Sequence, residues 1–396
     1  MRFPRNLVSI AAGAMALGLV VGACGSSDNG SSSATTAGST AASGSSAAPD
    51  TSGGGSGTCK PGTGTVPPIK TETADGKGKT VGLLYDITGR GDKSFNDAAA
   101  AGLDKAKADF GITASESTPT AQDNSDRPPR IKEFVGKNDL IVAVGFLWAD
   151  AVKASATANP KQLYAIVDPS PTVDLPNVRN MNFTEEQSSF LVGVAAACAS
   201  KTGKLGFIGG VQNDLIEKFE AGFTAGAKKV KPDATVEVKY ITQPPDFTGF
   251  NDPTKGKAIA AAMYGEGIDV IYAAAGGSGK GLFEAAKASG KKPGDVYAIG
   301  VDSDQYQSVS PDLQPYILTS ALKRVDVATY EAIADALNGK LTGEKKLYNL
   351  ANNGVGYAVS NKDVNKYAGT IEDYKQQIID GKITVPTKPG TAPAGS

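Results

Sequence analysis

The 396-residue sequence contains no histidine, and it has only three cysteines, four methionines and one tryptophan. The missing histidine removes the commonest general base, the Ser-His and Cys-His nucleophile pairs, and the commonest metal ligand. Lysine and arginine together number 40 against 41 aspartates and glutamates, so the sequence offers no basic field for nucleic acid. We therefore expect neither an enzyme nor a nucleic-acid-binding protein, and nothing in the sequence calls for a cofactor or a metal.

Long apolar runs are almost as scarce. The one clear example, residues 7–21, follows the basic segment 1–5 and is short for a membrane span, so it predicts a signal peptide over residues 1–23. The run ends in Val21-Gly-Ala-Cys24, which resembles a bacterial lipobox. We expect Cys24 to be lipidated, and the mature protein to be extracytoplasmic and anchored to the bacterial cell membrane. The alternative is an ordinary secretory signal followed by an incidental cysteine.

Residues 24–78 are predicted to form a tether behind that cysteine. From Gly25 to about Gly57 the chain is almost entirely serine, glycine, alanine and threonine. Such a segment cannot bury enough apolar surface to offset its chain entropy. The globular body would therefore work at some distance from the membrane.

The two remaining cysteines are Cys59, before the first predicted strand, and Cys198, near a predicted helix end. Two thiols in an oxidising compartment can form a disulfide. The alternative is two separately buried thiols.

The remaining chain has the composition of a globular protein, and apolar strands alternate with helices along it. This alternation predicts an α/β fold with parallel sheets. The pattern starts at residues 81–86 and restarts at residues 204–210, so we expect two βα lobes with the chain crossing between them. We assign residues 79–183 and 303–340 to lobe I, and residues 184–302 and 341–390 to lobe II.

The first strand–loop–helix unit carries the first candidate site. Its strand ends at Asp86, at the carboxyl edge where open α/β sheets bind ligands. Ser94 with Asp97 three residues later fits a capping box, which predicts that a helix begins there. This layout sets Asp86, Phe95 and Asn96 around one crevice. The alternative is that Phe95 belongs to the core and Asn96 faces solvent.

Other aspartates also follow apolar strands or stand just beyond them, namely Asp150, Asp168 and Asp302. Carboxylates without an acid–base partner do not make an enzyme, but they can accept hydrogen bonds from hydroxyl groups. Residues 275–281 are similar to a phosphate-binding loop but fail the motif at both ends, so we interpret their glycines as a turn where the backbone approaches a ligand.

Four motifs occur in one order: Asp92-Lys-Ser-Phe-Asn96, Asn251-Asp-Pro253, Gly300-Val-Asp302 and Thr319-Ser-Ala-Leu-Lys323. Together they resemble the basic membrane protein (BMP) family of solute-binding lipoproteins, over about residues 79–380. The resemblance implies a type I periplasmic-binding-protein fold, in which two parallel-sheet lobes joined by a three-crossing hinge close on a ligand. It also implies an ABC importer whose permease is the partner of this protein.

The characterised relatives in that family include purine nucleoside receptors, so the resemblance implies a nucleoside site between the lobes. Phe95 would lie on one face of the base and Phe250 on the other, with Phe247 as the competing candidate for the second face. The other members of the implied site, which contact the base or the ribose, are Asp86, Asn96, Asp150, Gly277, Asp302 and Lys323.

Lys323 would reach the ribose hydroxyls or hold Asp302, and the alternative is a structural ion pair with a strand-end aspartate. The favoured hypothesis is a monomeric receptor for a nucleoside, in the first place a purine nucleoside. The same fold with another small solute, such as a sugar, is the second. An exported hydrolase is the third, disfavoured because no nucleophile–base pair is visible.

Overall fold

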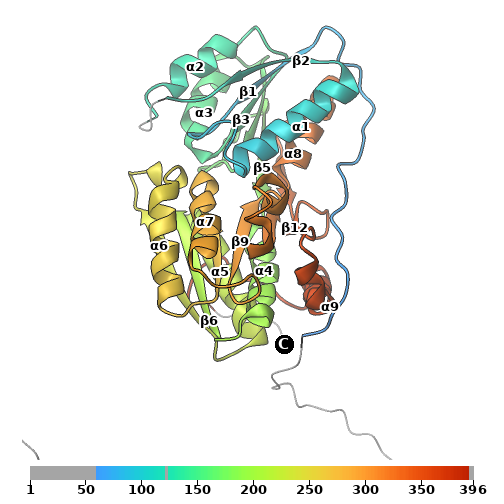
Figure 1. Cartoon of the computed structure of the whole chain (residues 1–396). Helices are drawn as coiled ribbons and strands as arrows, with labels where there is room; N and C mark the ends of the chain where they lie inside the picture. Colours follow the sequence, from blue (N-terminus) through green and yellow to red (C-terminus); the bar gives the residue numbers. More distant parts are fainter. Residues whose placement is uncertain (1–58, 121–123, 392–396) are drawn as a thin grey trace, which may run out of the picture. The chain divides into compact units, whose positions relative to one another are not determined.

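The computed structural model describes residues 59–120 and 124–391. These residues form two six-stranded sheets with helices between the strands, arranged as two lobes (Figure 1). The predicted signal peptide, Cys24 and the tether up to residue 58 lie outside the described residues.

Lobe I is built on a sheet in which every strand pair is parallel. Its central strands are covered on both faces, as the continuous apolar run at residues 140–144 predicts. Across the sheet the strands are β11 (Lys345–Tyr348), β5 (Val178–Phe183), β4 (Leu163–Val167), β3 (Leu140–Val144), β1 (Thr80–Leu84) and β2 (Thr113–Ser117). The helices are α1 (Phe95–Phe110), α2 (Arg127–Phe134), the short η1 (Phe146–Trp148), α3 (Ala149–Ala158) and α8 (Val325–Leu337).

Lobe II has a parallel sheet with one antiparallel strand at its edge. Across the sheet the strands are β12 (Val355–Tyr357), β10 (Ile317–Lys323), β9 (Tyr297–Asp302), β8 (Val270–Ala274), β6 (Lys204–Val211) and β7 (Thr235–Thr242). The helices are α4 (Glu185–Ala199), α5 (Asp214–Val230), α6 (Pro253–Gly265), α7 (Lys280–Ala288) and α9 (Ala368–Ile379). Shorter helical turns are η2 (Thr248–Phe250), η3 (Gly276–Gly279), η4 (Gln305–Ser308), η5 (Gln314–Tyr316) and η6 (Lys362–Lys366). The α/β fold class predicted from the sequence is confirmed.

The chain passes between the lobes after β5, after β10 and between β11 and β12. The expected lobe boundaries are therefore wrong in two places. Residues 303–340 were expected in lobe I, but β10 extends the lobe II sheet beside β9, and only α8 packs on α1 of lobe I. Residues 341–390 were expected in lobe II, but β11 pairs with β5. Strand–helix alternation predicts that strands exist, whereas long-range hydrogen bonds decide which sheet each one joins.

Residues 59–78, which were expected to belong to the tether, instead run along both lobes (Figure 1). On lobe II, Cys59 forms a disulfide with Cys198 of α4, with 5.9 Å between the Cα atoms. On lobe I, the tyrosine hydroxyl of Tyr330 in α8 accepts a hydrogen bond from the backbone N–H of Glu72. Between them Arg324, at the second crossing, donates to the carbonyl of Pro67. Specific bonds of this kind order a segment whose composition alone does not predict order.

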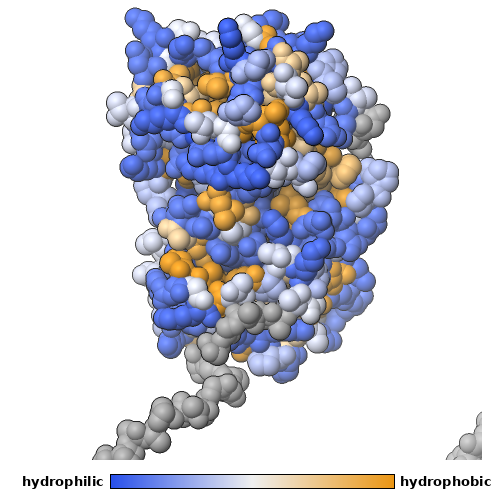
Figure 2. All heavy atoms as spheres, turned by 180° about the vertical axis from the view of Figure 1, so that it is seen from behind, coloured by the Kyte–Doolittle hydropathy of each residue, from blue (hydrophilic) through white to orange (hydrophobic). Residues whose placement is uncertain are grey.

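The large hydrophobic side chains of the described residues are mostly buried, and those exposed are Val66, Leu347 and Ile379. Seen from behind, the surface is mainly hydrophilic with scattered hydrophobic patches (Figure 2). Within residues 59–120 and 124–391, every helix is too short or too polar to cross a bilayer.

Candidate functional site

A cavity lies between the lobes at the carboxyl ends of their strands, as expected for open α/β sheets. It encloses about 620 Å³ of space outside the atoms, open solvent included. Lobe I contributes Asp86, Ile87, Thr88, Asp92, Phe95, Asn96, Gly145, Phe146 and Asp168 to its lining. The rest of the lining consists of Leu215, Ile216, Phe219, Phe250, Ala274, Gly276, Val301, Asp302 and Lys323.

The loop that enters α1 is held by Asp92, which begins the Asp92-Lys-Ser-Phe-Asn96 motif but was not among the predicted site residues. One carboxylate oxygen of Asp92 accepts from the backbone N–H groups of Ser94 and Asp97, and the other accepts from the backbone and side-chain N–H groups of Asn96. Helix α1 begins at Phe95, as expected, but the predicted capping box is wrong. The hydroxyl group of Ser94 makes no cap and points to lobe II instead.

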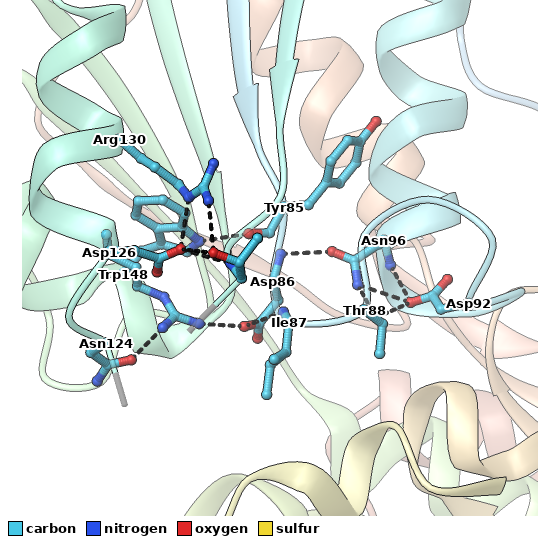
Figure 3. Close-up of polar contacts among 12 residues, drawn as sticks. Tyr85, Asp86, Ile87, Thr88, Asp92, Asn96, Asn124, Asp126, Arg130 and Trp148 are labelled. Carbon is cyan, nitrogen blue, oxygen red and sulfur yellow. Dashed lines mark hydrogen bonds and ion pairs between the residues drawn. The ribbon is translucent and has the colours of Figure 1, made fainter. Parts of the chain in front are cut away.

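Asn96 lines the cavity, but its side chain is committed to the same loop. Its amide oxygen accepts from the backbone N–H of Asp86 at 2.8 Å, and its amide nitrogen donates to Thr88 at 2.7 Å and to Asp92 at 3.0 Å. Figure 3 shows these contacts around the end of β1. The amide donors are therefore used within lobe I, and the second lone pair of the oxygen is the capacity left for a ligand.

Asp86 is anchored from the opposite side of the same loop. Its Oδ1 accepts from Arg127 at 3.0 Å and from the backbone N–H of Ile87 at 2.9 Å. Burial raises the pKa of the Asp86 carboxyl, and the Arg127 guanidinium opposes that rise. Asp86 is thus the lobe I carboxylate that the sequence predicted at the cavity, with its charge balanced by an arginine that the sequence did not single out.

On lobe II, Asp302 ends β9 with φ +64°, in the left-handed region that costs a non-glycine residue about 1–3 kcal/mol. Its Oδ2 accepts from the Ser94 hydroxyl of lobe I at 2.5 Å, so this bond joins the two lobes. Its Oδ1 has no hydrogen-bond partner among the described residues. Burial raises the pKa of Asp302 to about 7, although the Lys323 ammonium nearby works against this.

Lys323, at the end of β10, is fully buried and forms ion pairs with Asp168 and, at 3.1 Å, with Glu185. Burial disfavours its charge, but Asp168 and Glu185 outweigh burial and raise the pKa of Lys323. Burial also raises the pKa of Asp168 to about 6, and the second oxygen of that carboxyl is buried with no hydrogen-bond partner among residues 59–120 and 124–391. Of the two roles left open for Lys323, the structure therefore contains the ion pair with a strand-end aspartate, and that aspartate is Asp168 rather than Asp302.

Two phenylalanines from opposite lobes line the cavity, Phe95 from the first turn of α1 and Phe250 from η2. The ring of Phe95 also lies 5.2 Å from the Lys323 ammonium. Phe247 does not line the cavity; it packs edge-on against Phe146 of lobe I, with 5.8 Å between ring centroids. The arrangement therefore favours Phe250 over Phe247 for the second face of a flat ligand.

Two predicted site residues are not brought to the lining. Asp150 is exposed in the first turn of α3, and Gly277 is buried in η3 next to the lining residue Gly276. The apolar wall formed by Leu215, Ile216 and Phe219 at the start of α5 was missed. Its signal in the sequence is apolar residues at helical spacing directly after a glycine-ended strand.

The cavity combines apolar walls with four acidic side chains and one buried ammonium. Among the described residues there is no cluster of acidic and cysteine side chains that could hold a metal ion. Two lobes that contact each other across such a cavity, joined by three crossings, define a solute-binding protein of the type I periplasmic fold. A solved solute-binding protein of an Aeropyrum pernix ABC transporter system is similar to this chain, with a TM-score of 0.67 and 28% identity, over 78% of this chain and 94% of that one. A Conexibacter woesei solute-binding protein shares the fold at a TM-score of 0.62 and 22% identity, over 78% and 99% of the two chains.

The family follows from the sequence comparisons. The model of the Bmp family, described as ABC transporter substrate-binding protein PnrA-like, matches residues 79–388, so the chain belongs to this family. A relative from Lactococcus lactis named ABC transporter nucleoside-binding protein BmpA is 40% identical, over 79% of this chain and 91% of its own length. Basic membrane protein A of Borreliella burgdorferi is 33% identical, over 78% and 87%. The protein is an extracytoplasmic substrate-binding protein of an ABC transporter, and its relatives are solute-binding proteins rather than enzymes.

Proposed function

We propose that the cleft binds a nucleoside, in the first place a purine nucleoside, and delivers it to an ABC permease. The observation that carries this proposal is the pair of phenylalanines, Phe95 and Phe250, which line one cavity from opposite lobes beside a carboxylate oxygen of Asp302 that has no partner among the described residues. The Lactococcus lactis relative named as nucleoside-binding supports the same ligand class.

The physical chemistry of the cleft suits such a ligand. Two rigid aromatic rings can hold a flat base between them at a low cost in conformational entropy. A carboxylate can accept hydrogen bonds from both hydroxyl groups of a ribose, and closure of the lobes strengthens those bonds by excluding water. The failed phosphate-loop motif at residues 275–281 argues against nucleotides, because it supplies no phosphate cradle.

Calorimetry with inosine, guanosine, adenosine and cytidine tests the proposal. Removing one stacking ring, in Phe95→Ala or Phe250→Ala, should weaken binding about 5- to 150-fold, because a base–aromatic stack contributes about 1–3 kcal/mol. The matched control is Phe247→Ala, which should cost less than Phe250→Ala because Phe247 lies outside the lining. If the wild type binds no nucleoside, or binds ribose as well as it binds nucleosides, the proposal is wrong.

The ribose end has its own test. Asp302→Ala should weaken nucleoside binding at least as much as the loss of one ring, because two hydroxyl groups lose their hydrogen-bond acceptor in a closed site. A 2′,3′-dideoxynucleoside should bind the wild type poorly and lose little more in Asp302→Ala. If Asp302→Ala lowered the affinity for the nucleoside and for its dideoxy analogue by the same factor, the ribose hydroxyl groups would not contact Asp302.

We also propose that the mature protein is a monomer anchored by a lipid on Cys24. The motif Val21-Gly-Ala-Cys24 and the serine- and glycine-rich segment behind it support the anchor. Cys24→Ala should release the protein from the membrane fraction or leave the precursor uncleaved. A variant that fractionates and migrates like the wild type would exclude this anchor.

A further inference from the structure

The two carboxylate oxygens of Asp86 have different surroundings. Oδ1 is occupied by the Arg127 guanidinium and by the backbone N–H of Ile87. Oδ2 has no hydrogen-bond partner among the described residues, and Asp86 lines the cavity. Gly145, with φ +103°, keeps the space beside this oxygen free, because a Cβ atom there would lie 2.4 Å from Oδ2. The loop therefore leaves Oδ2 of Asp86 as the oxygen available to a ligand in the cleft.

Arg127 itself is held on several sides. Its side chain is 1% exposed, and its Nη1 donates to the side-chain oxygen of Asn124. Its guanidinium lies 5.4 Å from the centre of the Trp148 ring, whose N–H donates to the carbonyl of Tyr85 at 2.9 Å. Figure 3 shows Asn124 and Trp148 on one side of Asp86 and Asn96 on the other. A planar guanidinium that bonds Asn124 and Asp86 with separate nitrogens cannot be replaced by a lysine ammonium without loss of geometry.

We infer that Arg127 is a positioning residue that acts through Asp86: it fixes an ionised carboxylate whose free oxygen accepts an N–H group of the ligand. This inference rests on the proposed function and adds the ligand class, a nucleobase with an N–H donor on the edge that faces lobe I. An ionised carboxylate can only accept, so a base with acceptors alone on that edge would lose the contact and leave Oδ2 of Asp86 without a hydrogen bond. Asn96 cannot donate to such a base instead, because its amide donors are used by Thr88 and Asp92.

The charged groups around Asp86 are consistent with this role. Arg127 is the cation that faces it, and Asp92 is the nearby carboxylate that opposes its ionisation. Arg130 lies on the same helix but points to Asp126 and Ser117 rather than to Asp86. The chain thus offers a matched control, an arginine three residues further along α2 with no contact to the cleft carboxylate.

The experiment compares inosine, which carries a ring N–H, with purine riboside, whose base has only acceptors on its ring edge. The wild type should prefer inosine by about 10- to 100-fold, because a hydrogen bond to a charged group is among the stronger ones. In Arg127→Met this preference should fall to within about fivefold, and Arg130→Met should keep it. Arg127→Lys should recover part of it. A preference in Arg127→Met equal to that of the wild type would overturn the inference and leave the nucleoside function standing.

A double-mutant cycle separates positioning from folding. Asp86→Asn should lower the preference as Arg127→Met does, and the double variant should lose little more, because both changes remove the same contact. If Arg127→Met does not fold, Asp86→Asn alone decides: an unchanged preference for inosine overturns the inference. A wild type that binds neither nucleoside overturns the proposed function itself.

The pH dependence of inosine binding gives a further test, because it would not change if Arg127 were needed only for folding. Without Arg127 the pKa of Asp86 should rise further, so inosine binding by Arg127→Met should weaken as the pH falls from 8 to 6, relative to the wild type. Asp302 and Asp168 titrate in both proteins, so the ratio of the two affinities isolates Asp86. A ratio that stays constant with pH would contradict the inference.

Discussion

The two walls of the cleft hold their aspartates in different ways. Asp86 of lobe I is paired with an arginine of its own lobe and bonded to its own loop. Asp302 of lobe II takes its hydrogen bond from Ser94 of the other lobe, and Lys323, the cation that lowers its pKa, is paired with Asp168 and Glu185 instead. Asp86 is therefore held by residues of its own lobe, whereas the hydrogen bond to Asp302 requires the two lobes to be in contact.

The difference also appears in the titration of the two groups. Burial raises the pKa of both carboxyls, but for Asp302 it reaches about 7. Asp302 can therefore change its protonation near neutral pH when a ligand or the other lobe approaches.

The largest expected effect comes from removing the buried cation of the lobe II wall. Lys323→Met leaves Asp168 buried without its ammonium and leaves Glu185 with Lys218 alone, so the free energy of unfolding should fall by about 3–5 kcal/mol. Arg127→Met should cost less, because the Asp86 side chain is 14% exposed and keeps its backbone donor. Urea denaturation followed by circular dichroism at pH 7 measures both.

The matched control for Lys323 is Lys257→Met. Lys257 pairs with Glu284 on the surface, where both side chains are about half exposed. Exposed pairs of this kind contribute about 0–1 kcal/mol. A Lys323→Met variant as stable as Lys257→Met would show that the buried cluster does not depend on its cation.

The second prediction concerns pH and separates Asp302 from Asp86. The pKa of the Asp302 carboxyl is about 7 in the folded protein against about 4 for an ordinary aspartate, so folding favours its protonated form. Its contribution to stability is complete below pH 4 and is lost as the pH rises through 7. The wild type should therefore lose about 2 kcal/mol relative to Asp302→Asn between pH 5 and pH 7.

Denaturation of both proteins across that range checks the prediction. Asp168, with a pKa of about 6, and Glu186, with a pKa of about 7, titrate in the same window, but both proteins contain them. The difference between the two stability curves therefore reports Asp302. A difference that grows in the opposite direction, or stays flat, would contradict the raised pKa.

The sequence predicted the elements of this cleft better than its bonds. Apolar runs gave the strands, and Asp86, Phe95, Phe250 and Asp302 all reach the cavity from the strand ends and loops where they were expected. The sequence could not predict that β10 joins the sheet of lobe II and β11 the sheet of lobe I, because alternation carries no information on which sheet a strand joins.

The hydrogen-bond and ion-pair partners of the buried polar side chains could not be predicted from the sequence either. Arg127 stands in a polar stretch before two prolines, where nothing signals a side chain that is 1% exposed. The capping box failed for a similar reason. Asp92 competes for the same N–H groups and leaves the Ser94 hydroxyl for Asp302, and only the tertiary structure shows which acceptor wins.

The smallest expected effect tests the bond that makes the two walls different. Ser94→Ala removes the hydroxyl that lobe I donates to Asp302, while the hydrogen bond from Ser303 to the Ser94 carbonyl remains. Losing one such bond from the closed state should cost about 1 kcal/mol, or about fivefold in ligand affinity. Because the bond forms on closure, stopped-flow measurements should show the change in the dissociation rate and not in the association rate. The control is Ser155→Ala, whose hydroxyl bonds Tyr164 within lobe I and should leave ligand binding unchanged. A Ser94→Ala variant that releases ligand at the wild-type rate would mean that Asp302, like Asp86, is held by its own lobe.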